Sequence, residues 1–568
     1  MARNRVCGRP VEGATPRLAA GVERNHRIAM LKSKLALAGA ILFVVLLGAR
    51  VLGAHYVYFW EGDEMSLAAG IAALVRDNGG DMYRYGPQVG YHRLVELLDL
   101  LLGGDPARIP TIMITLSAVA GAVIPVAGLA SFRADLTSTE RWLLAWVLAI
   151  NPILWMSSAY GGSAMPSVAV ATVGLALLSN RPGPKYEVLA LLLFALGILI
   201  RADAVLLTPA VAFLLHLRHR SLGAVAMRIA IVGFSLVVVY GLLFVFDPRM
   251  ADFASSMREH LTNPGFTTRF WEYLLWALGP IPALFAVWGI RNLVDERRHL
   301  LWAVLLWCLP VFGFYFASTT TPRYFLLVLL PISLCGAVGM SRLARDLAPL
   351  LRARAAQAAV LVAASLHLFI GLGHFTPGGP GNLLWESSFE THDGPMWTGA
   401  YLYKTYLDPT PLARFRTGGG FGQRVWLAQG FEATLAEAAA RRLQGRTVVV
   451  LLKNWNGHVF YYNVQVAGAT FISRRPGMPF LVETRMELGG ATLISFHVGG
   501  RDYAELSTLP VQEGDEVWMM TSRGEQPDLA FRERLAPGLG VVAVGDSTLS
   551  LRRFRVLQAQ SAGTLPTP

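Results

Sequence analysis

The chain between residues 35 and 375 is a succession of apolar runs separated by short loops that carry Arg and Lys. About 20 mostly apolar residues in a helix cross the roughly 30 Å hydrocarbon core of a bilayer. A helix satisfies its own backbone hydrogen bonds in that core, so the runs predict about eleven transmembrane helices. The predicted spans are residues 35–53, 109–131, 142–159, 164–178, 188–200, 204–217, 229–246, 273–290, 300–317, 324–340 and 356–374.

The low content of charged residues agrees with a polytopic α-helical membrane protein. Charged residues make up 15% of the chain, whereas soluble proteins carry roughly a quarter. The net charge of +12 does not indicate nucleic-acid binding, because the Arg residues lie in loops between apolar runs rather than on one basic face. The three Cys residues form no CxxC pair, so neither a disulfide framework nor a zinc site is expected.

The distribution of Arg and Lys predicts the orientation of the chain in the membrane. If the basic N-terminal segment, residues 1–34, is cytoplasmic, the inner segments hold 22 Arg and Lys residues and the outer loops before residue 376 hold 9. Basic residues are enriched on the cytoplasmic side. We therefore expect a transmembrane domain at residues 35–375 of the plasma (inner) membrane. An odd number of spans then places the C-terminal domain, residues 376–568, on the extracytoplasmic side.

The first outer loop, residues 54–108, is long and contains two helical patterns. Residues 65–75 and 89–102 place apolar residues at helical spacing, with charged residues on the other side. The pattern predicts two amphipathic helices lying along the membrane surface, with turns at the NGGD and YGP segments between them.

A group of carboxylates follows the first predicted span, at Glu61, Asp63 and Glu64. Asp63 and Glu64 could cap the next helix, because a helix N-terminus favours negative charge. Alternatively they provide a catalytic base or a metal ligand facing a cavity at the membrane edge. The residues alone leave both interpretations open.

The layout of residues 35–340 resembles the GT-C glycosyltransferases, in particular the protein O-mannosyltransferases and the bacterial lipid A aminoarabinose transferases. The resemblance rests on a first span, an acidic pair, and two surface helices joined by a turn that reads YRYGP at residues 83–87. Further similar features are IRADA at residues 200–204, which opens a span, and TPRYF at residues 321–325, which enters a later span that contains Pro331.

The resemblance implies a GT-C-like domain that transfers a sugar from a polyprenyl-phosphate donor, within the membrane lipid, to a lipid, polysaccharide or protein acceptor on the extracytoplasmic face. It implies that Asp63 is the base that takes the proton of the acceptor hydroxyl. Glu64 would support Asp63 or help to hold a divalent cation, Mg²⁺ or Mn²⁺, and no other cofactor is expected.

Cations must meet the departing phosphate, and the planar fork of Arg suits phosphate. The candidate donor-phosphate ligands are Arg84, His92, Arg93, Arg201 and Arg323. Arg201 and Arg323 lead, because each lies at the outer end of a span, where Arg is disfavoured without a partner. Arg201 could instead form a structural pair with Asp203 or Asp63. Arg323 could instead extend to lipid headgroups, while the loop arginines could lie on solvated helix faces and His92 could bond locally.

The C-terminal segment, residues 376–568, reads as one compact α/β domain. It begins with the linker-like TPGGPGN, residues 432–443 have helical composition, and residues 447–452, 458–466, 492–498 and 517–521 are strand-like. Core packing is the expected role of the aromatic residues Trp455, Trp518, Tyr461 and Tyr462, and sugar stacking is the alternative. The domain is expected to bind the acceptor or to act as a scaffold.

Two other functional classes fit a polytopic membrane protein. A transporter or flippase of lipid-linked sugars usually places ionisable groups at mid-membrane, and the predicted spans are nearly free of them. A non-catalytic envelope-assembly protein would use the C-terminal domain for interaction. Loss of sugar transfer in an Asp63→Asn variant would favour the transferase over both.

Overall fold

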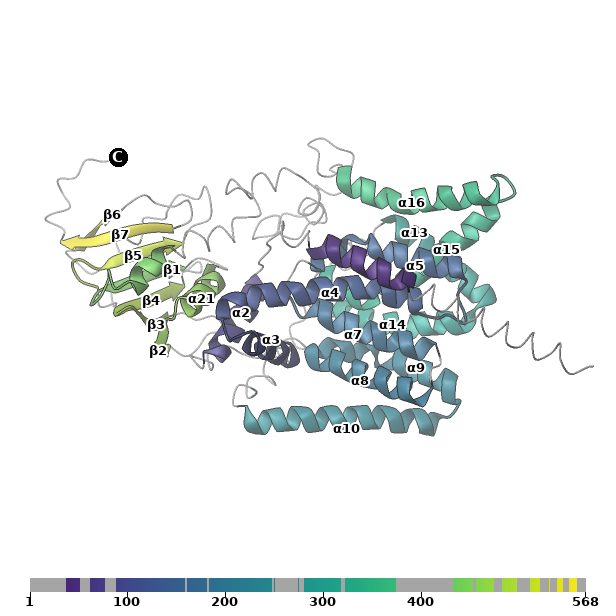
Figure 1. The fold of residues 1–568 in the computed structure, drawn as a ribbon, viewed down its shortest axis with the longest axis horizontal. Helices are drawn as coiled ribbons and strands as arrows, with labels where there is room; N and C mark the ends of the chain where they lie inside the picture. Colours follow the sequence, from purple (N-terminus) through teal and green to yellow (C-terminus); the bar gives the residue numbers. More distant parts are fainter. Residues whose placement is uncertain are drawn as a thin grey trace, which may run out of the picture.

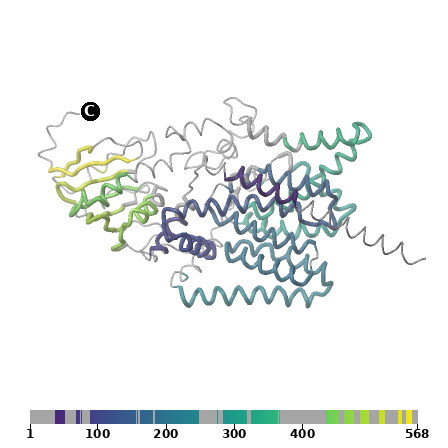
Figure 2. The backbone as a smooth tube through the Cα atoms, viewed as in Figure 1, coloured from purple at the N-terminus to yellow at the C-terminus, as the bar shows by residue number. Residues whose placement is uncertain are grey.

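The described part of the computed structural model consists of a helical bundle and a C-terminal sheet domain (Figure 1). Figure 2 traces the backbone of both parts, which lie end to end along the long axis of the molecule. The structure describes residues 37–51, 62–76, 88–158, 161–180, 183–247, 250, 274, 280–317, 322–373, 433–452, 456–474, 483–497, 511–520, 531, 539–544 and 551–558.

The bundle is built from α-helices and short 3₁₀ segments (η) that follow one another closely in the chain. In order these are a helix at Leu37–Val51, α2 (Gly62–Val75), α3 (Val89–Leu101), η2 (Pro106–Arg108), α4 (Ile109–Ala130), α5 (Ser138–Ala149), α6 (Pro152–Ser157), α7 (Ala164–Ser179), α8 (Pro184–Ile200), η3 (Ala202–Leu207), α9 (Thr208–His219), α10 (Leu222–Phe246), α13 (Pro280–Glu296), α14 (Arg298–Ala317), η5 (Pro322–Val328), α15 (Leu329–Leu347) and α16 (Ala353–Gly373).

Among the described residues, four helical segments are long and apolar enough to cross a membrane by length and composition. They are Pro106–Ala130, Leu222–Phe246, Arg298–Ala317 and Tyr324–Leu347. Shorter apolar helices accompany them at Leu37–Val51, Ala164–Ser179 and Ala353–Ala363. The bundle is therefore a membrane-type helical fold, and the total of about eleven spans stays a prediction.

Three of the predicted spans are interrupted, and the one at residues 324–340 starts as η5 and becomes α-helical only at Leu329. The one at residues 142–159 consists of α5 and α6, which begins at Pro152. Pro lacks a backbone N–H and disfavours helix in the residue before it, so α5 ends first. The side chain of Asn151 then accepts a hydrogen bond from the N–H of Leu154 at 3.1 Å and caps α6. The span predicted at residues 204–217 starts as η3 and becomes α-helical only at Thr208.

Glycines allow α13 and α15 to pack with their backbones in contact. A Cβ on Gly289 would lie 1.8 Å from the carbonyl oxygen of Cys335, and one on Gly339 would lie 2.1 Å from that of Phe285. Small residues permit this close approach in membrane helices, where dispersion contacts rather than exclusion of water drive association. The helix pair thus depends on the absence of side chains at two positions.

Ion pairs join the helices at the bundle end remote from the sheet domain. The described pairs there include Glu187 with Arg218 (2.6 Å), His219 (2.9 Å) and Arg228, Glu140 with Arg297 (2.9 Å), and Asp135 with His299 (2.9 Å). These residues come from the Arg-rich segments between apolar runs. Each carboxylate therefore fixes the ends of two or more helices relative to one another.

The two segments predicted to be helical in the first outer loop form α2 and α3, and their place along a membrane surface stays a prediction. Every residue from Leu67 to Ala73 is buried, so α2 has no solvated face in its centre. One side contacts the bundle through α3 and α4, and the other contacts the helix α21 (Asn456–Val466) of the sheet domain. The amphipathic pattern alone could not indicate that a second domain covers α2.

The described residues of the sheet domain form seven strands in the order β2-β3-β4-β1-β5-β7-β6. Their bounds are β1 (Thr447–Leu452), β2 (Thr470–Arg474), β3 (Glu483–Leu488), β4 (Ala491–His497), β5 (Glu516–Met520), β6 (Leu539–Ala543) and β7 (Leu551–Gln558). β1 pairs in parallel with β4 and β5, and the outer strands pair antiparallel. The central strand β1 is buried, as expected where both faces of a parallel sheet are covered.

The predicted α/β class of this domain is confirmed, and so are the strands predicted at residues 447–452, 492–498 and 517–521. Residues 433–439 are helical, within the predicted range. The strand predicted at residues 458–466 is wrong, because this segment forms α21. Its aromatic residues favour a strand locally, but burial continues through consecutive positions from Phe460 to Gln465, as in a helix packed on several sides.

The sheet domain docks on the bundle end that carries α2 and η2. The hydroxyl of Tyr462 donates to the carbonyl oxygen of Pro106 at 3.3 Å, and Arg76 Nη2 donates to that of Val466 at 3.2 Å. Apolar side chains of α2, α4 and α21 belong to one continuous core, which includes Ile71 and Phe460. The docked end of the bundle is thus fixed to the sheet domain.

Candidate functional site

Arg201 occupies the junction between α8 and η3, at the bundle end that faces the sheet domain. Its backbone is extended, with φ −153° and ψ 120°, and it separates the two helical segments. Its Nε donates to Asp203 Oδ2 at 2.7 Å, and both side chains are largely buried, at 12% and 13% exposure. The structural pair considered as an alternative for Arg201 therefore exists.

Two tyrosines from later helices complete the surroundings of this pair. The hydroxyl of Tyr315, on α14, donates to the same Asp203 oxygen at 2.7 Å. Its ring stacks on that of Tyr324 with centroids 4.8 Å apart, and the Arg201 guanidinium lies 5.3 Å from the Tyr324 centroid. A cation over an aromatic face is attracted by the ring quadrupole. These contacts join α8, α14 and η5 around one guanidinium.

A polar relay connects Arg201 to the start of α3. Arg201 Nη1 donates to Ser163 Oγ at 3.4 Å, and Ser163 donates to Gln88 Oε1 just before α3. Tyr91 on α3 donates to the carbonyl oxygen of Gly161 at 2.6 Å. The guanidinium is thus held by groups from four parts of the chain. We name Arg201, Asp203, Ser163, Tyr315 and Tyr324 the Arg201 cluster.

The Arg201 cluster retains capacity to bind an anion. Among the described groups, Nη2 of Arg201 has no hydrogen-bond acceptor, and Oδ1 of Asp203 has no donor. Arg323 lies in the first turn of η5, directly before Tyr324, so its backbone adjoins the cluster, and its side chain lies outside the described atoms. The two arginines ranked first from sequence thus belong to neighbouring segments.

The acidic candidates lie at the same bundle end. Asp63 and Glu64 form the first turn of α2, which packs on α3 and η2, and their side chains lie outside the described atoms. Arg84 lies outside the described residues. No group of three His, Cys, Asp or Glu side chains in metal-binding proximity occurs within the described residues.

His92 and Arg93 lie on α3 in contacts that position this helix. His92 is buried, and Arg93 pairs with Glu96 at 2.6 Å and with the buried Asp247, which follows α10. Gly90 rests on the end of α8, since a Cβ there would lie 2.3 Å from the carbonyl oxygen of Leu199. Arg93 is thus paired with two carboxylates, while about a third of its side chain (34%) stays exposed.

The tyrosines and Ser163 are members of the site that sequence reasoning missed. Tyr315 lies 112 residues after its partner Asp203, and nothing in the local pattern connects them. Tyr324 was visible within TPRYF but was considered only as the neighbour of Arg323. A signal was available for both, because a polar aromatic residue at the end of an apolar run needs a hydrogen-bond partner.

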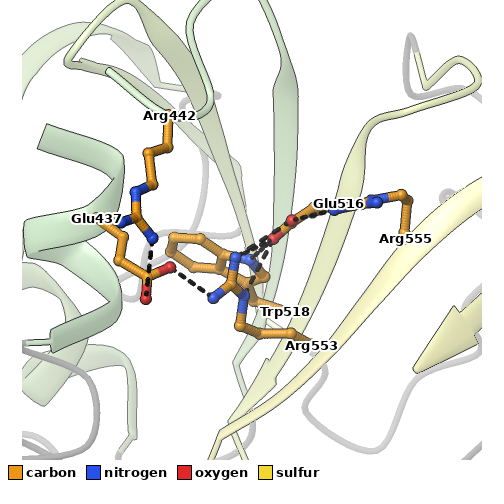
Figure 3. Close-up of polar contacts among 6 residues, drawn as sticks. All are labelled: Glu437, Arg442, Glu516, Trp518, Arg553 and Arg555. Atoms are coloured by element: carbon orange, nitrogen blue, oxygen red, sulfur yellow. Dashed lines mark hydrogen bonds and ion pairs between the residues drawn. The ribbon is translucent and has the colours of Figure 1, made fainter. Parts of the chain in front are cut away.

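A second charged cluster lies inside the sheet domain and joins its helical segment to the strands (Figure 3). The buried Glu516 accepts from Trp518 Nε1 at 2.8 Å and from Arg553 Nη2 at 3.0 Å. Arg553 also donates to Glu437, in the segment at residues 433–439, at 2.8 Å. Burial lowers the pKa of Arg553, but the charges of Glu516 and Glu437 outweigh it and raise the pKa above its ordinary value.

Burial of the aromatic residues in this domain confirms the core interpretation. Trp518, Tyr461 and Tyr462 are each less than a tenth exposed, and Trp455 lies outside the described residues. The hydroxyl of Tyr461 bonds with Ser495 Oγ at 2.9 Å. Burial raises the pKa of Tyr461 to about 12, although its hydrogen bonds with Ser495 and Thr484 oppose this shift.

Comparisons with known proteins extend the argument from the residues to the whole fold. No protein-family model and no curated protein matches the sequence. Among solved structures, ArnT from Cupriavidus metallidurans bound to undecaprenyl phosphate is similar, with a TM-score of 0.56 and 13% identity over 93% of this chain and 99% of that chain. ArnT from the same organism in the apo state gives a TM-score of 0.57 and 14% identity over 93% of this chain and 100% of that chain.

A weaker similarity, with a TM-score of 0.44, relates the chain to the oligosaccharyltransferase AglB from Archaeoglobus fulgidus in complex with an inhibitory peptide and a dolichol-phosphate. That match has 13% identity and covers 75% of this chain and 63% of that chain. The ArnT alignments instead include both the bundle and the sheet domain, since they cover nearly the full length of both chains. The chain therefore has the fold of ArnT.

Proposed function

We propose that this protein is a membrane glycosyltransferase that moves a sugar from a polyprenyl-phosphate donor to a lipid, polysaccharide or protein acceptor. The observation that carries the proposal is the Arg201 cluster, which lies at the bundle end that also holds the start of α2 and of η5. The fold supports it, because one ArnT structure of this fold is bound to undecaprenyl phosphate.

In the proposed reaction Asp63 is the general base. The acceptor oxygen attacks the anomeric carbon and its proton passes to the Asp63 carboxylate. The bond between the anomeric carbon and the donor phosphate oxygen breaks, and the polyprenyl phosphate leaves with the bonding electrons. Attack opposite the leaving group inverts the anomeric configuration. Glu64, in the same helical turn, supports Asp63.

Arg201 and Arg323 are proposed to meet the negative charge that develops on the departing phosphate. Fixed donors aimed at developing charge lower the barrier because they need no reorganisation during the reaction. Asp203 and Tyr324 hold the Arg201 guanidinium in place, so these two residues act as positioning residues. Arg84, His92 and Arg93 extend the proposed phosphate side, and the contacts of Arg93 with Glu96 and Asp247 set the place of α3.

A divalent cation, Mg²⁺ or Mn²⁺, is the one cofactor included in the proposal. Two neighbouring carboxylates such as Asp63 and Glu64 are a donor set that suits a hard cation. Such a cation would supply additional positive charge near the phosphate. Chelation, followed by re-addition of either ion, tests for it through recovery of transfer.

The proposed topology places residues 1–34 in the cytoplasm, a membrane domain of about eleven spans at residues 35–375, and residues 376–568 outside the plasma (inner) membrane. The Arg201 cluster and the sheet domain share one end of the bundle, which agrees with chemistry on the extracytoplasmic side. Accessibility of engineered cysteines in residues 1–34 and 376–568 to an impermeant thiol reagent tests the orientation.

Mass spectrometry of envelope glycans tests the activity. A strain that lacks the gene is complemented with the wild-type chain, with Asp63→Asn or with Arg345→Gln, an exposed cation on α15 at the other bundle end. We expect the glycan modification to disappear only with Asp63→Asn, at equal protein levels. Modification that persists with Asp63→Asn would remove Asp63 as the base. An unchanged glycan profile in the deletion strain would contradict the transferase itself.

A further inference from the structure

An apolar groove lies at the bundle end remote from the sheet domain. Its volume is about 740 Å³, and the helix Leu37–Val51, α4, α7 and the start of α8 line it. The half-buried side chains of Phe43, Val126, Val173 and Leu177 form much of its surface. In Figure 1 the helix Leu37–Val51 lies beside α4, so the groove is on the flank of the bundle.

One exposed cation lies at the polar end of this groove, and a second cation lies near it, outside the lining. Arg133, in the turn after α4, lines it and is exposed, and its charge repels that of Arg141 on α5. Within the described residues neither guanidinium has a carboxylate at ion-pair distance, whereas Arg297 and Arg218 at the same bundle end are paired. Two neighbouring like charges without a counter-charge favour binding of an anion.

The turn that presents Arg133 is held by the end of α7. The N–H of Arg133 donates to Asn180 Oδ1 at 2.9 Å, and Asn180 Nδ2 donates to the carbonyl oxygen of Ala130 at 2.7 Å. Phe132 adopts a left-handed backbone with φ 50°, and its N–H donates to Ser179 Oγ at 3.0 Å. A bulky residue rarely adopts this conformation, so the contacts with α7 impose the position of Arg133.

We propose that this groove binds one anionic phospholipid of the surrounding leaflet, with an acyl chain along the apolar wall and the phosphate beside Arg133 and Arg141. An apolar channel that ends at two cations matches the two parts of such a lipid. Tyr186, 58% exposed at the groove, has the amphipathic ring that favours the membrane interface.

This lipid site differs from the proposed donor site. The groove lies beside the C-terminal end of α4, whereas the opposite end of α4 and η2 touch the sheet domain through Pro106. The bound lipid therefore belongs to the leaflet opposite the proposed donor site, and it stabilises the bundle from that side. Its binding does not depend on whether the protein transfers sugars.

Native mass spectrometry of the full-length chain in detergent tests the proposal, with phosphatidylglycerol and phosphatidylcholine of the same acyl chains as probes. The wild-type chain should retain phosphatidylglycerol in preference. An Arg near a membrane surface contributes about fivefold to anionic lipid binding, so Arg133→Gln and Arg141→Gln should each weaken retention about fivefold, and the double variant about 25-fold. Glycerol 3-phosphate, which lacks acyl chains, should not displace the lipid.

Control variants separate this site from general attraction between lipids and a basic protein. Arg345→Gln removes an exposed cation at the same bundle end but outside the groove, and it should leave retention unchanged. Val126→Trp should reduce retention of both lipids by filling the groove. If Val126→Trp does not fold, the Arg133→Gln variant still tests the proposal, because Arg133 is exposed and its substitution removes only a charge. Equal phosphatidylglycerol retention by the wild type and the double variant would overturn the proposal, and so would an equal loss with Arg345→Gln.

Discussion

The contact between Gly90 and the end of α8 gives a sharp test of how the candidate site is assembled. Alanine at this position places a Cβ 2.3 Å from the carbonyl oxygen of Leu199 and 3.0 Å from the backbone N of Ile200. Both are backbone atoms directly before Arg201, so no side-chain rotation can relieve the overlap. The start of α3 must move away from α8 instead.

The size of this movement follows from the contact distance. The distance from the added Cβ to the carbonyl oxygen of Leu199 has to lengthen from 2.3 Å to at least 3.4 Å, where ordinary van der Waals contact begins. The start of α3 must therefore shift by about 1 Å. Such a shift separates Gln88 from Ser163 and Tyr91 from Gly161, and so loosens the relay to Arg201. A displacement of about 1 Å in a catalytic arrangement lowers the rate on the order of 100-fold, or about 2.7 kcal/mol of transition-state stabilisation.

The measurement is the initial rate of product formation in membranes that contain equal amounts of the wild-type chain, Gly90→Ala or Gly241→Ala. Gly241 lies on α10 with no atom within 4 Å of its added Cβ, so its substitution should leave the rate unchanged. Alanine is also the better helix former, by up to about 1 kcal/mol, so a loss in Gly90→Ala cannot come from weakened helix propensity. Full transfer by a folded Gly90→Ala variant would refute the role given to α3.

Three further predictions concern stability. Arg553→Met leaves the buried Glu516 with only Arg555, a half-exposed cation 4.0 Å away, and should destabilise the sheet domain by about 3 kcal/mol, measured as faster proteolysis of that domain. Gly339→Val forces α13 and α15 apart at their backbone contact and should lower the melting temperature in detergent sharply, or abolish the folded yield. Burial raises the pKa of Tyr461 from 10 to about 12, so its neutral form stabilises the fold fully below pH 10, and this contribution is lost between pH 10 and 12. The intact Tyr461→Phe chain should therefore lose less stability over that interval, as followed by circular dichroism.

Matched controls accompany these variants. Arg442→Met removes an exposed cation 4.0 Å from Glu437 and should change stability by less than about 1 kcal/mol. Gly313→Val adds a side chain on α14 where nothing lies within 4 Å, and it should be tolerated. The argument is contradicted if Arg553→Met changes stability no more than Arg442→Met does, or if Gly339→Val is tolerated as well as Gly313→Val. The tyrosine argument fails if wild type and Tyr461→Phe lose stability in parallel above pH 10.

Much of the bundle could be predicted from the apolar runs, because a long apolar segment has few alternatives to a helix in a membrane. The breaks were harder to place. Pro152 was visible in the sequence as a helix terminator, but the apolar character of residues 142–159 outweighed it in the prediction. The error at α21 has the opposite origin, since its aromatic residues favour a strand locally, while packing against α2 decides the outcome.

The candidate site was predictable only in part. Arg201 stood out because an Arg at the outer end of a span requires a partner, and Asp203, its partner, was two residues away. Tyr315 could not be assigned, because its contact with Asp203 exists only after η3 and α14 pack together. The ion pair of Arg93 with Asp247, 154 residues apart, depends in the same way on the folded arrangement of α3 and α10.

The enclosure of α2 has a consequence for any attempt to divide this protein. Its apolar residues, such as Ile71, belong to a core shared by the bundle and α21. A truncated chain that ends before the sheet domain would expose the apolar surface of α2 to water, and large exposed apolar surfaces promote aggregation. Inactivity of such a fragment would then reflect loss of the packing between the bundle and the sheet domain, not loss of a catalytic group. The two modules are one folding unit, and their separate contributions are accessible only through point substitutions in the intact chain.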